Sequence, residues 1–304
     1  MQLKDQQRVH QAVNYVLANI AAPLSIAEVA NHVHLSAFHF HRVFKRITNE
    51  PFNQFVRRKR LEKAFHSLLR YHQPSITDVS ECCGFSSPAN FSKAFQAYFG
   101  FSASQHRQGA LGINSKNGKL FSKYGKEISP ALLYNGSLSE QESEQVKAQI
   151  KRIEVVSLPA THYGVIASTQ GYAIEGIMDA WSQMREWLAF NHIAIEPGKT
   201  AGFCFDNVWL TPIEVCRYES GYEIADIDMA KQAGMCVRAQ AEGRYLLIEY
   251  DGKMSDMQTF YLWLLSEYFP QTRLTITYEY VIERYLEINY EQDIMKLEVL
   301  VKVH

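Results

Sequence analysis

The apolar positions in the first third of the chain follow a helical period, and one pattern occurs twice. In residues 24–45 and again in residues 75–95, a short amphipathic segment precedes a turn and a second segment whose aromatic residues are four positions apart. Phe40 of the first copy recurs as Phe91 of the second. A spacing of four places such rings on one buried face of a helix. The pattern therefore predicts an all-α domain with two helix-turn-helix units.

Residue types at the helix ends support this prediction. Ser25 and Glu28 have the spacing of a capping box, and Ser75 opens the second copy. Gly84 supplies the turn of that copy. A short helix that is braced from behind while its polar N-terminal face stays free suits the major groove of DNA. Two such helices indicate a protein that contacts two successive groove segments.

Between the two copies, residues 52–69 predict a longer helix with an inward apolar face. Its basic run, residues 57–60, has two interpretations. Such a run is more often a solvated helix face, but beside two DNA-binding helices part of it would contact phosphate groups. We assign no base contact to it.

The second half of the chain has a different pattern. A strand-like alternation in residues 152–157 is followed by an apolar stripe at helical spacing in residues 174–191. A similar order returns 82 residues later, where Trp181 recurs as Trp263. Two similar halves with few helices predict an α+β domain with a two-repeat sheet and a ligand site where the halves meet.

The stretch between these two patterns is polar and has little periodicity, which is typical of a linker or a partly ordered spacer. The predicted organisation is therefore a double helix-turn-helix domain in residues 1–108, a linker in residues 109–150 and an α+β ligand-binding domain in residues 151–304.

Charge is distributed unequally between these domains, although the whole chain has a net charge of −1. Residues 1–108 hold 13 Lys and Arg against 6 Asp and Glu, a net charge of +7. Residues 151–304 hold 13 against 22, a net charge of −9. A basic front domain favours a polyanionic partner and counterion release on binding. The acidic rear domain would repel nucleic acid, so we expect it to serve another purpose.

The five cysteines show no Cys-x-x-Cys or Cys/His metal-ligand spacing, and their odd number indicates reduced thiols. The chain opens with polar and charged residues and holds no run of about twenty apolar residues. We therefore expect a soluble cytoplasmic protein with no membrane segment, no metal and no cofactor.

Residues 8–107 resemble the DNA-binding domain of AraC/XylS transcription regulators. The similarity rests on His-Phe-His-Arg-Val-Phe at 39–44, on Gly-Phe-Ser-Ser at 84–87 and on the closing Arg107. It implies two helix-turn-helix motifs joined by a long central helix, with double-stranded promoter DNA as the partner. Family members often have Gly in the first turn, where this chain has His34. A non-Gly residue is costly in a left-handed conformation, so we expect a different backbone path there.

The same resemblance implies roles for individual side chains. Arg42 would form a bidentate pair with guanine, and Asn90 would contact adenine. Base-edge contacts fall on Phe38, His41, Arg42, Pro88, Ala89, Asn90 and Lys93. Phosphate contacts fall on Ser36, Lys45, Ser87 and Ser92. The alternative for each of them is an ordinary exposed helix residue.

Residues 151–303 resemble the gyrase-inhibitor-like ligand domain, also called the effector-binding or multidrug-binding domain. The similarity rests on short motifs in a fixed order, among them Ile-Glu-Arg-Tyr-Leu at 282–286. That family uses a buried acid on the penultimate strand to bind cationic or lipophilic ligands, and Glu283 occupies this place. Strand alternation puts Tyr285 on the same side of the sheet, and we expect Trp209 to flank the site.

Glu283 has a second interpretation, as the partner of an arginine such as Arg217 in a structural ion pair. In that case the acidic anchor of the ligand site would lie elsewhere, for example at Glu279 or Glu219. An ionised carboxylate shielded from water is costly unless it has a partner, and a cationic ligand can supply that partner.

Three function classes remain open. The first is a ligand-responsive transcription regulator, whose front domain binds promoter DNA and whose rear domain binds a small-molecule effector. The second is a small-molecule hydrolase, although the sequence offers no Ser/His/Asp, Cys/His or metal-ligand set. The third is a DNA-binding module whose rear domain docks a protein such as RNA polymerase. We expect the first, a protein that is not an enzyme.

Overall fold

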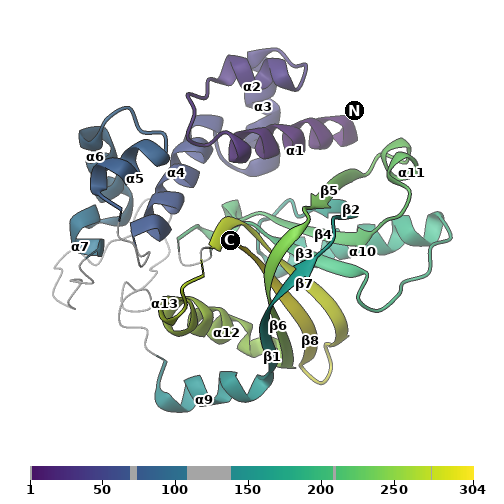
Figure 1. Ribbon diagram of the computed structural model, residues 1–304. Coiled ribbons are helices and arrows are strands. Elements are labelled where there is room, and N and C mark those ends of the chain that lie inside the picture. The colour runs from purple at the N-terminus through teal and green to yellow at the C-terminus, as the bar shows by residue number, and fades with distance from the viewer. Residues whose placement is uncertain (1, 69–73, 108–137, 208–209, 275) are drawn as a thin grey trace. The chain divides into compact units, whose positions relative to one another are not determined.

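The computed structural model describes residues 2–68, 74–107, 138–207, 210–274 and 276–304 (Figure 1). These residues form two compact units, a helical one largely within residues 8–137 and a sheet-containing one largely within residues 138–304. The expected all-α front domain and α+β rear domain are both confirmed.

The helical unit contains two copies of one motif on either side of a long helix. The helices of this part of the chain are α1 (Gln2–Ala18), α2 (Ile26–His32), α3 (Ala37–Thr48), α4 (Phe52–Leu68), α5 (Ile76–Cys82), α6 (Pro88–Phe99) and α7 (Ala103–Arg107). A serine side chain caps the N-terminus of each motif helix, and the caps are Ser25, Ser36, Ser75 and Ser87. Because each cap bonds a backbone N–H three residues on, the sequence itself determines where these helices begin.

Two local predictions for the first motif are wrong. Ser25 accepts a hydrogen bond from the backbone of Glu28, but the Glu28 carboxylate accepts from Tyr15 on α1 instead of completing a capping box. His34 does not take a different backbone path, because it has φ 55°, close to the φ 75° of Gly84. The hydrogen bonds of the turn therefore impose the same left-handed conformation on both residues.

Helix α4 connects the cores of the two motifs. Near its start, the ring centroid of Phe55 lies 5.4 Å from that of Phe44 on α3. Near its end, Phe65 lies 5.0 Å from Phe99 on α6, and its backbone carbonyl accepts a hydrogen bond from the buried His106. The aromatic residues spaced four apart are all buried, as their spacing predicts.

The second half of the chain contains one sheet of eight strands in which all neighbouring strands are antiparallel. The strands are β1 (Ile150–Leu158), β2 (Thr161–Ala167), β3 (Thr200–Cys204), β4 (Tyr218–Glu223), β5 (Cys236–Gln240), β6 (Gly243–Lys253), β7 (Ile276–Asn289) and β8 (Ile294–Val303). The helices are α9 (Glu140–Gln149), α10 (Ile174–Phe190), α11 (Ile227–Gln232), α12 (Met257–Trp263) and α13 (Phe269–Gln271), with short 3₁₀ turns at Ile213–Val215 and Met254–Asp256 and a π-helical turn at Leu264–Tyr268.

The strand order is β1-β6-β8-β7-β3-β4-β2-β5, and it confirms the two-repeat sheet. Strands β2, β3 and β4 of the first repeat correspond to β6, β7 and β8 of the second. The first strand of each repeat pairs with the other repeat, since β1 joins β6 and β5 joins β2. The repeats therefore exchange their edge strands and meet at β3 and β7.

Part of the expected linker is a helix. Helix α9 begins with a capping box between Ser139 and Glu142, and the side chains of Gln145 and Gln149 donate to Asp256. α9 packs against α12, β1 and β6. The polar composition of this segment led to the linker prediction. Tertiary contacts nevertheless hold the segment as a helix against the sheet-containing unit.

Candidate DNA interface and ligand site

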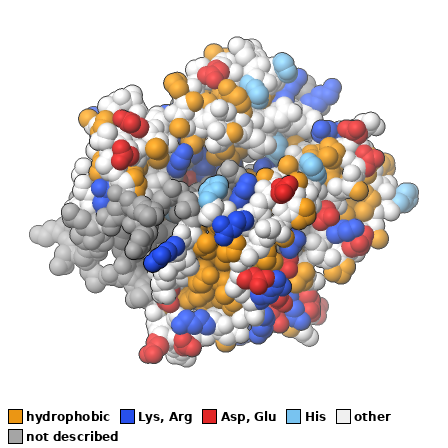
Figure 2. Space-filling view, in the orientation of Figure 1, with side chains coloured by type: hydrophobic (Ala, Val, Ile, Leu, Met, Phe, Trp, Pro, Cys, Tyr) orange, Lys and Arg blue, Asp and Glu red, His pale blue; other side chains and the backbone are white. Residues whose placement is uncertain are grey.

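The first motif presents all of its expected DNA-contacting residues at the surface of α3. Phe38 is 81% exposed although it is a large apolar residue. The guanidinium of Arg42 lies 3.3 Å from Nδ1 of His39. Figure 2 shows blue Lys or Arg and pale blue His side chains at the surface in the region of α1 to α3. The exposed residues are Ser36, Phe38, His41, Arg42 and Lys45.

The second motif presents a less basic surface on α6. Pro88 occupies the first helical turn, where its fixed φ suits the start of a helix. The Asn90 side-chain amide donates to Ser86 at 2.8 Å, so contact with adenine would require it to exchange this bond. Ser87 is half-buried, and the exposed residues are Pro88, Ala89, Asn90, Ser92 and Lys93.

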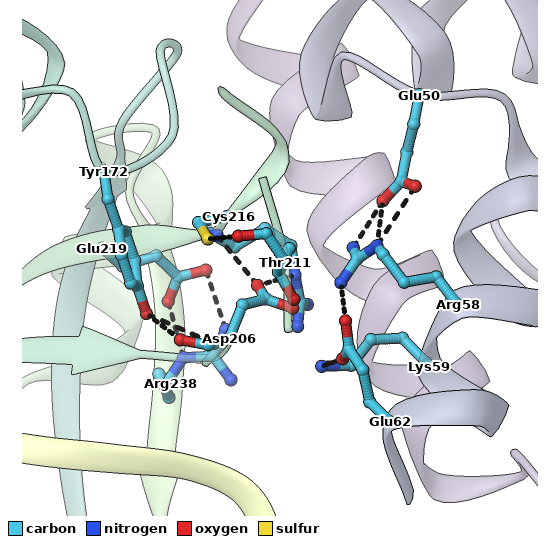
Figure 3. Close-up of polar contacts among 11 residues, drawn as sticks. Glu50, Arg58, Lys59, Glu62, Tyr172, Asp206, Thr211, Cys216, Glu219 and Arg238 are labelled. Carbon is cyan, nitrogen blue, oxygen red and sulfur yellow. Dashed lines mark hydrogen bonds and ion pairs between the residues drawn. The ribbon is translucent and has the colours of Figure 1, made fainter. Parts of the chain in front are cut away.

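The basic run on α4 is largely internal, which neither interpretation of the sequence predicted. Arg58 lies between Glu50 and Glu62, and Lys59 also pairs with Glu62 (Figure 3). All four of these side chains are buried. Arg60 donates to backbone carbonyls in the turn that follows α1, and Arg57 is exposed. The run therefore holds the helical unit together.

Glu283 on β7 lies at the centre of a hydrogen-bonded group of aromatic side chains. It is only 8% exposed. One carboxylate oxygen accepts from the hydroxyl of Tyr261 on α12 at 2.5 Å, and the other accepts from Tyr285 at 2.6 Å. Strand alternation thus places Tyr285 where the sequence predicted it. We call the group formed by Glu283, Tyr285, Tyr261, Tyr218 and Trp181 the Glu283 cluster.

The rest of the Glu283 cluster comes from the first repeat. The hydroxyl of Tyr218 on β4 lies 3.2 Å from that of Tyr285, and the indole Nε1 of Trp181 on α10 donates to Tyr218 at 2.7 Å. The Trp181 ring also contacts Tyr285 edge-on, with 5.6 Å between centroids. Sequence reasoning missed Tyr218, Tyr261 and the hydrogen bond of Trp181, because no spacing rule connects residues so far apart.

Burial controls the protonation of this group. Burial raises the pKa of the Tyr218, Tyr261 and Tyr285 hydroxyls well above 10, and nearby negative groups, Glu283 among them, raise them further. Burial likewise raises the pKa of the Cys204 thiol on β3, and the adjacent Glu283 adds to that shift. The tyrosines and the thiol therefore stay protonated at neutral pH.

The arginine that could have paired with Glu283 and one of the two alternative acidic anchors are both engaged in other ion pairs. Arg217 bonds Asp206 at 3.1 Å, and Glu219 bonds Arg238 at 2.6 Å in a buried pair; Figure 3 draws Asp206, Glu219 and Arg238. Over the part of the chain that the structure describes, no cationic side chain pairs with Glu283. Two other predictions lie outside the described residues. They are Trp209 beside the ligand site and the side chain of Glu279 as the alternative acidic anchor.

Two family models match the chain. Residues 29–109 match a helix-turn-helix domain, and residues 151–304 match the GyrI-like small molecule binding domain. Among the helices within the described ranges, none has both the length and the hydropathy needed to cross a lipid bilayer.

Curated relatives are similar to about a third of the chain. The transcriptional activator RhaR of Pectobacterium atrosepticum is 36% identical over 112 residues, 37% of this chain and 39% of that protein. The transcriptional regulator ArgR of Pseudomonas aeruginosa is 35% identical over 100 residues, 33% of this chain and 30% of that protein. The transcriptional activator AarP of Providencia stuartii is 28% identical over 106 residues, 35% of this chain and 78% of that protein. The chain thus spans two fifths or less of the length of RhaR and ArgR.

Two solved structures are also similar. A transcriptional regulator with an AraC-type DNA-binding domain from Chromobacterium violaceum is 28% identical, with 36% of this chain and 96% of that chain covered at a TM-score of 0.33. The DNA-binding domain of AdpA in complex with a target DNA is 22% identical, with the same coverage at a TM-score of 0.32. Since the GyrI-like model spans about half of the sequence, the chain belongs to the GyrI-like small molecule binding domain family, and an AraC-type helix-turn-helix domain precedes that domain.

Proposed function

We propose that the chain is a transcription regulator that responds to a small molecule. The helical unit binds promoter DNA through α3 and α6 in two major-groove segments. The sheet-containing unit binds a cationic or hydrogen-bond-donating molecule at Glu283. The observation that carries this proposal is a buried carboxylate whose partners among the described residues are all neutral: the hydroxyls of Tyr261 and Tyr285 and the thiol of Cys204.

A carboxylate in this environment favours a ligand with a positive charge. Removing an ionised carboxylate from water costs several kcal/mol unless a partner compensates. The two tyrosine hydroxyls and the Cys204 thiol compensate only in part, because each supplies one neutral donor. The surrounding tyrosine and tryptophan rings add cation–π attraction for an organic cation. The charge and the rings together favour a small aromatic or aliphatic ammonium or amidinium.

The DNA-binding part of the proposal rests on exposure and charge. Both motif helices present their N-terminal polar residues to solvent, while the aromatic residues spaced four apart, Phe40 and Phe44 on α3 and Phe91 and Phe95 on α6, are buried. Residues 1–108 carry a net charge of +7, which supplies the counterion-release contribution to binding. The full chain should therefore bind duplex DNA with an affinity that falls steeply as salt rises, and a salt-independent affinity would exclude this mode.

Titration calorimetry on the full chain tests the ligand site, with benzylammonium as the probe and benzyl alcohol as its neutral counterpart. Glu283→Gln keeps the side-chain shape and removes the charge. It should weaken benzylammonium binding about ten-fold or more and leave benzyl alcohol nearly unaffected, since a hydrogen bond to a charged group contributes about 1.5–3 kcal/mol. The matched control is Glu287→Gln, an exposed residue of the same strand that pairs with Lys296.

Two outcomes would contradict this assignment. If Glu283→Gln unfolds the sheet-containing unit, Glu283 has a structural role. If benzylammonium binds both variants equally, the acidic anchor lies at another residue. The urea midpoint of ligand-free Glu283→Gln distinguishes unfolding from loss of binding. It should match the midpoint of Glu287→Gln.

A further inference from the structure

A chain of hydrogen bonds leads from α10 to the Glu283 carboxylate. The indole Nε1 of Trp181 lies 2.7 Å from the Tyr218 hydroxyl. That hydroxyl lies 3.2 Å from the hydroxyl of Tyr285, which in turn lies 2.6 Å from Glu283. The four residues come from α10, β4 and β7, so both repeats contribute to one path.

The two ends of this path fix the direction of every bond. An indole N–H can only donate, and a carboxylate can only accept. Tyr285 has one hydroxyl proton, and it uses that proton to donate a hydrogen bond to Glu283. Tyr218 must therefore donate its own proton to Tyr285 and accept from Trp181. Burial keeps both tyrosines protonated, as their raised pKa values show.

Gly202 on β3 makes room for this arrangement. It pairs directly with Glu283 across the seam where the two repeats meet. A Cβ atom at this position would lie 2.6 Å from the Tyr285 hydroxyl and 2.7 Å from the Tyr218 hydroxyl, closer than atoms can approach. Any side chain here would separate the two hydroxyls, so the absence of a side chain is what lets them meet.

We infer that Trp181 is a positioning residue of the ligand site, because its N–H orients the hydroxyls of Tyr218 and Tyr285 toward Glu283. This inference rests on the proposed function. Tyr261 also donates to Glu283, so every hydroxyl proton of the cluster is already engaged. Only lone pairs remain for a ligand, and the site selects ligands that carry N–H or O–H donors over fully alkylated cations. A ligand that donates a hydrogen bond to Glu283 weakens the bond from Tyr285 to Glu283. Through Tyr218, it also changes the hydrogen bond of Trp181 on α10.

The first test needs no ligand. In the ¹⁵N-labelled full chain, the Trp181 indole resonance is assigned by its loss in Trp181→Phe. Glu283→Gln should shift this resonance although the hydrogen bond of the Trp181 indole goes to Tyr218 and not to Glu283, and Gly202→Ala should shift it as well. Glu287→Gln should leave it in place. Unchanged indole resonances of the other tryptophans show that each variant is folded.

A double variant separates the hydrogen-bond path from the edge-on contact between Trp181 and Tyr285. Tyr218→Phe removes the central hydroxyl and keeps the ring. In that background, the effect of Glu283→Gln on the Trp181 resonance should fall to the level of the Glu287→Gln control. If the full shift persists, the ring contact transmits it and the inference is overturned. If Glu283→Gln causes no shift even in the wild-type background, the inference is also overturned.

The second test measures selectivity by calorimetry, with benzylammonium and benzyltrimethylammonium as a matched pair. Wild type should bind benzylammonium about ten-fold or more tightly than its trimethyl analogue, since only the former donates hydrogen bonds. Trp181→Phe should reduce this ratio several-fold, and an unchanged ratio would refute the positioning role. If neither probe binds wild type, the proposed ligand class fails, and the indole resonances alone decide whether the path exists.

Discussion

The two helix-turn-helix motifs have the same turn but different residues at its left-handed position. His34 has φ 55° and Gly84 has φ 75°. Their backbone N–H groups bond the carbonyls three residues before them, at 3.0 Å and 2.9 Å. The next residue in each turn bonds back to a carbonyl five residues earlier, at 2.9 Å and 3.0 Å. One set of backbone bonds thus accommodates two very different residues.

The surroundings of the two turns explain the difference. His34 is exposed, and its side chain extends without obstruction. At Gly84, a Cβ atom would lie 2.8 Å from the carbonyl oxygens of Ile20 and Ala21, in the turn that follows α1. Arg60 holds the same turn through the carbonyls of Ile20 and Ala22. Close packing against this turn requires glycine in the second motif, whereas the left-handed conformation by itself does not.

The largest expected effect comes from placing alanine at the left-handed position of the second turn. Gly84→Ala should lower the free energy of unfolding of the helical unit by about 3–4 kcal/mol, because the left-handed conformation costs roughly 1 and overpacking roughly 2–3. His34→Ala is the matched control and should be nearly neutral, since His34 already bears the conformational cost. Urea denaturation measures both, and equal losses would show that packing against the turn after α1 is unimportant.

A second difference is a buried imidazole on α7, His106, which packs against Phe95 of the second motif. Burial lowers the pKa of His106 to about 4, below its ordinary 6.5. The unfolded chain therefore binds a proton at a higher pH than the folded chain does. The stability from the neutral imidazole is fully present above pH 6.5 and is lost as pH falls toward 4, a loss of about 3 kcal/mol.

Urea denaturation of the helical unit at pH 7 and at pH 4 measures this loss. His106→Gln keeps a side-chain N–H for the carbonyl of Phe65 but cannot titrate in this range. It should remove most of the difference between the two pH values. If the variant and the wild type lose stability in parallel, other groups cause the acid sensitivity.

The two motifs also differ in the charge of their recognition helices. α3 carries Arg42, Lys45 and Arg46, whereas α6 carries Lys93 alone. On a DNA site selected from a random duplex library, Arg42→Ala should cost about 1–3 kcal/mol and relax the preference at one base pair. Lys45→Ala should weaken selected and random DNA alike, as expected for a phosphate contact. Equal weakening of both DNAs by Arg42→Ala would contradict base contact at this residue.

The smallest expected effect is a gain. His34→Gly removes the cost of the left-handed conformation and should raise the free energy of unfolding by at most ~1 kcal/mol, reduced by the greater entropy of glycine in the unfolded chain. A thermal melt of the full chain compares it with wild type. A clear loss of stability would show that the His34 side chain makes a contribution of its own to the fold.

The sequence by itself determined the local structure. The period of the apolar residues predicted the motif helices, the caps determined where they begin, and alternation placed Tyr285 beside Glu283. These features depend on neighbours within a few residues, so spacing alone reveals them. No comparable pattern marks β3 and β5, which are five residues each and take their place from the strands that pair with them.

Only the tertiary structure decided which polar groups are buried and which partners they have. It turned the basic run of α4 into an internal network around Arg58, and it brought Trp181 and Tyr218 to Glu283. Composition made both sets look like ordinary surface or core residues. The cost of burying a charge or a hydroxyl depends on partners that lie far away in the sequence, and only a complete fold brings those partners within hydrogen-bonding distance.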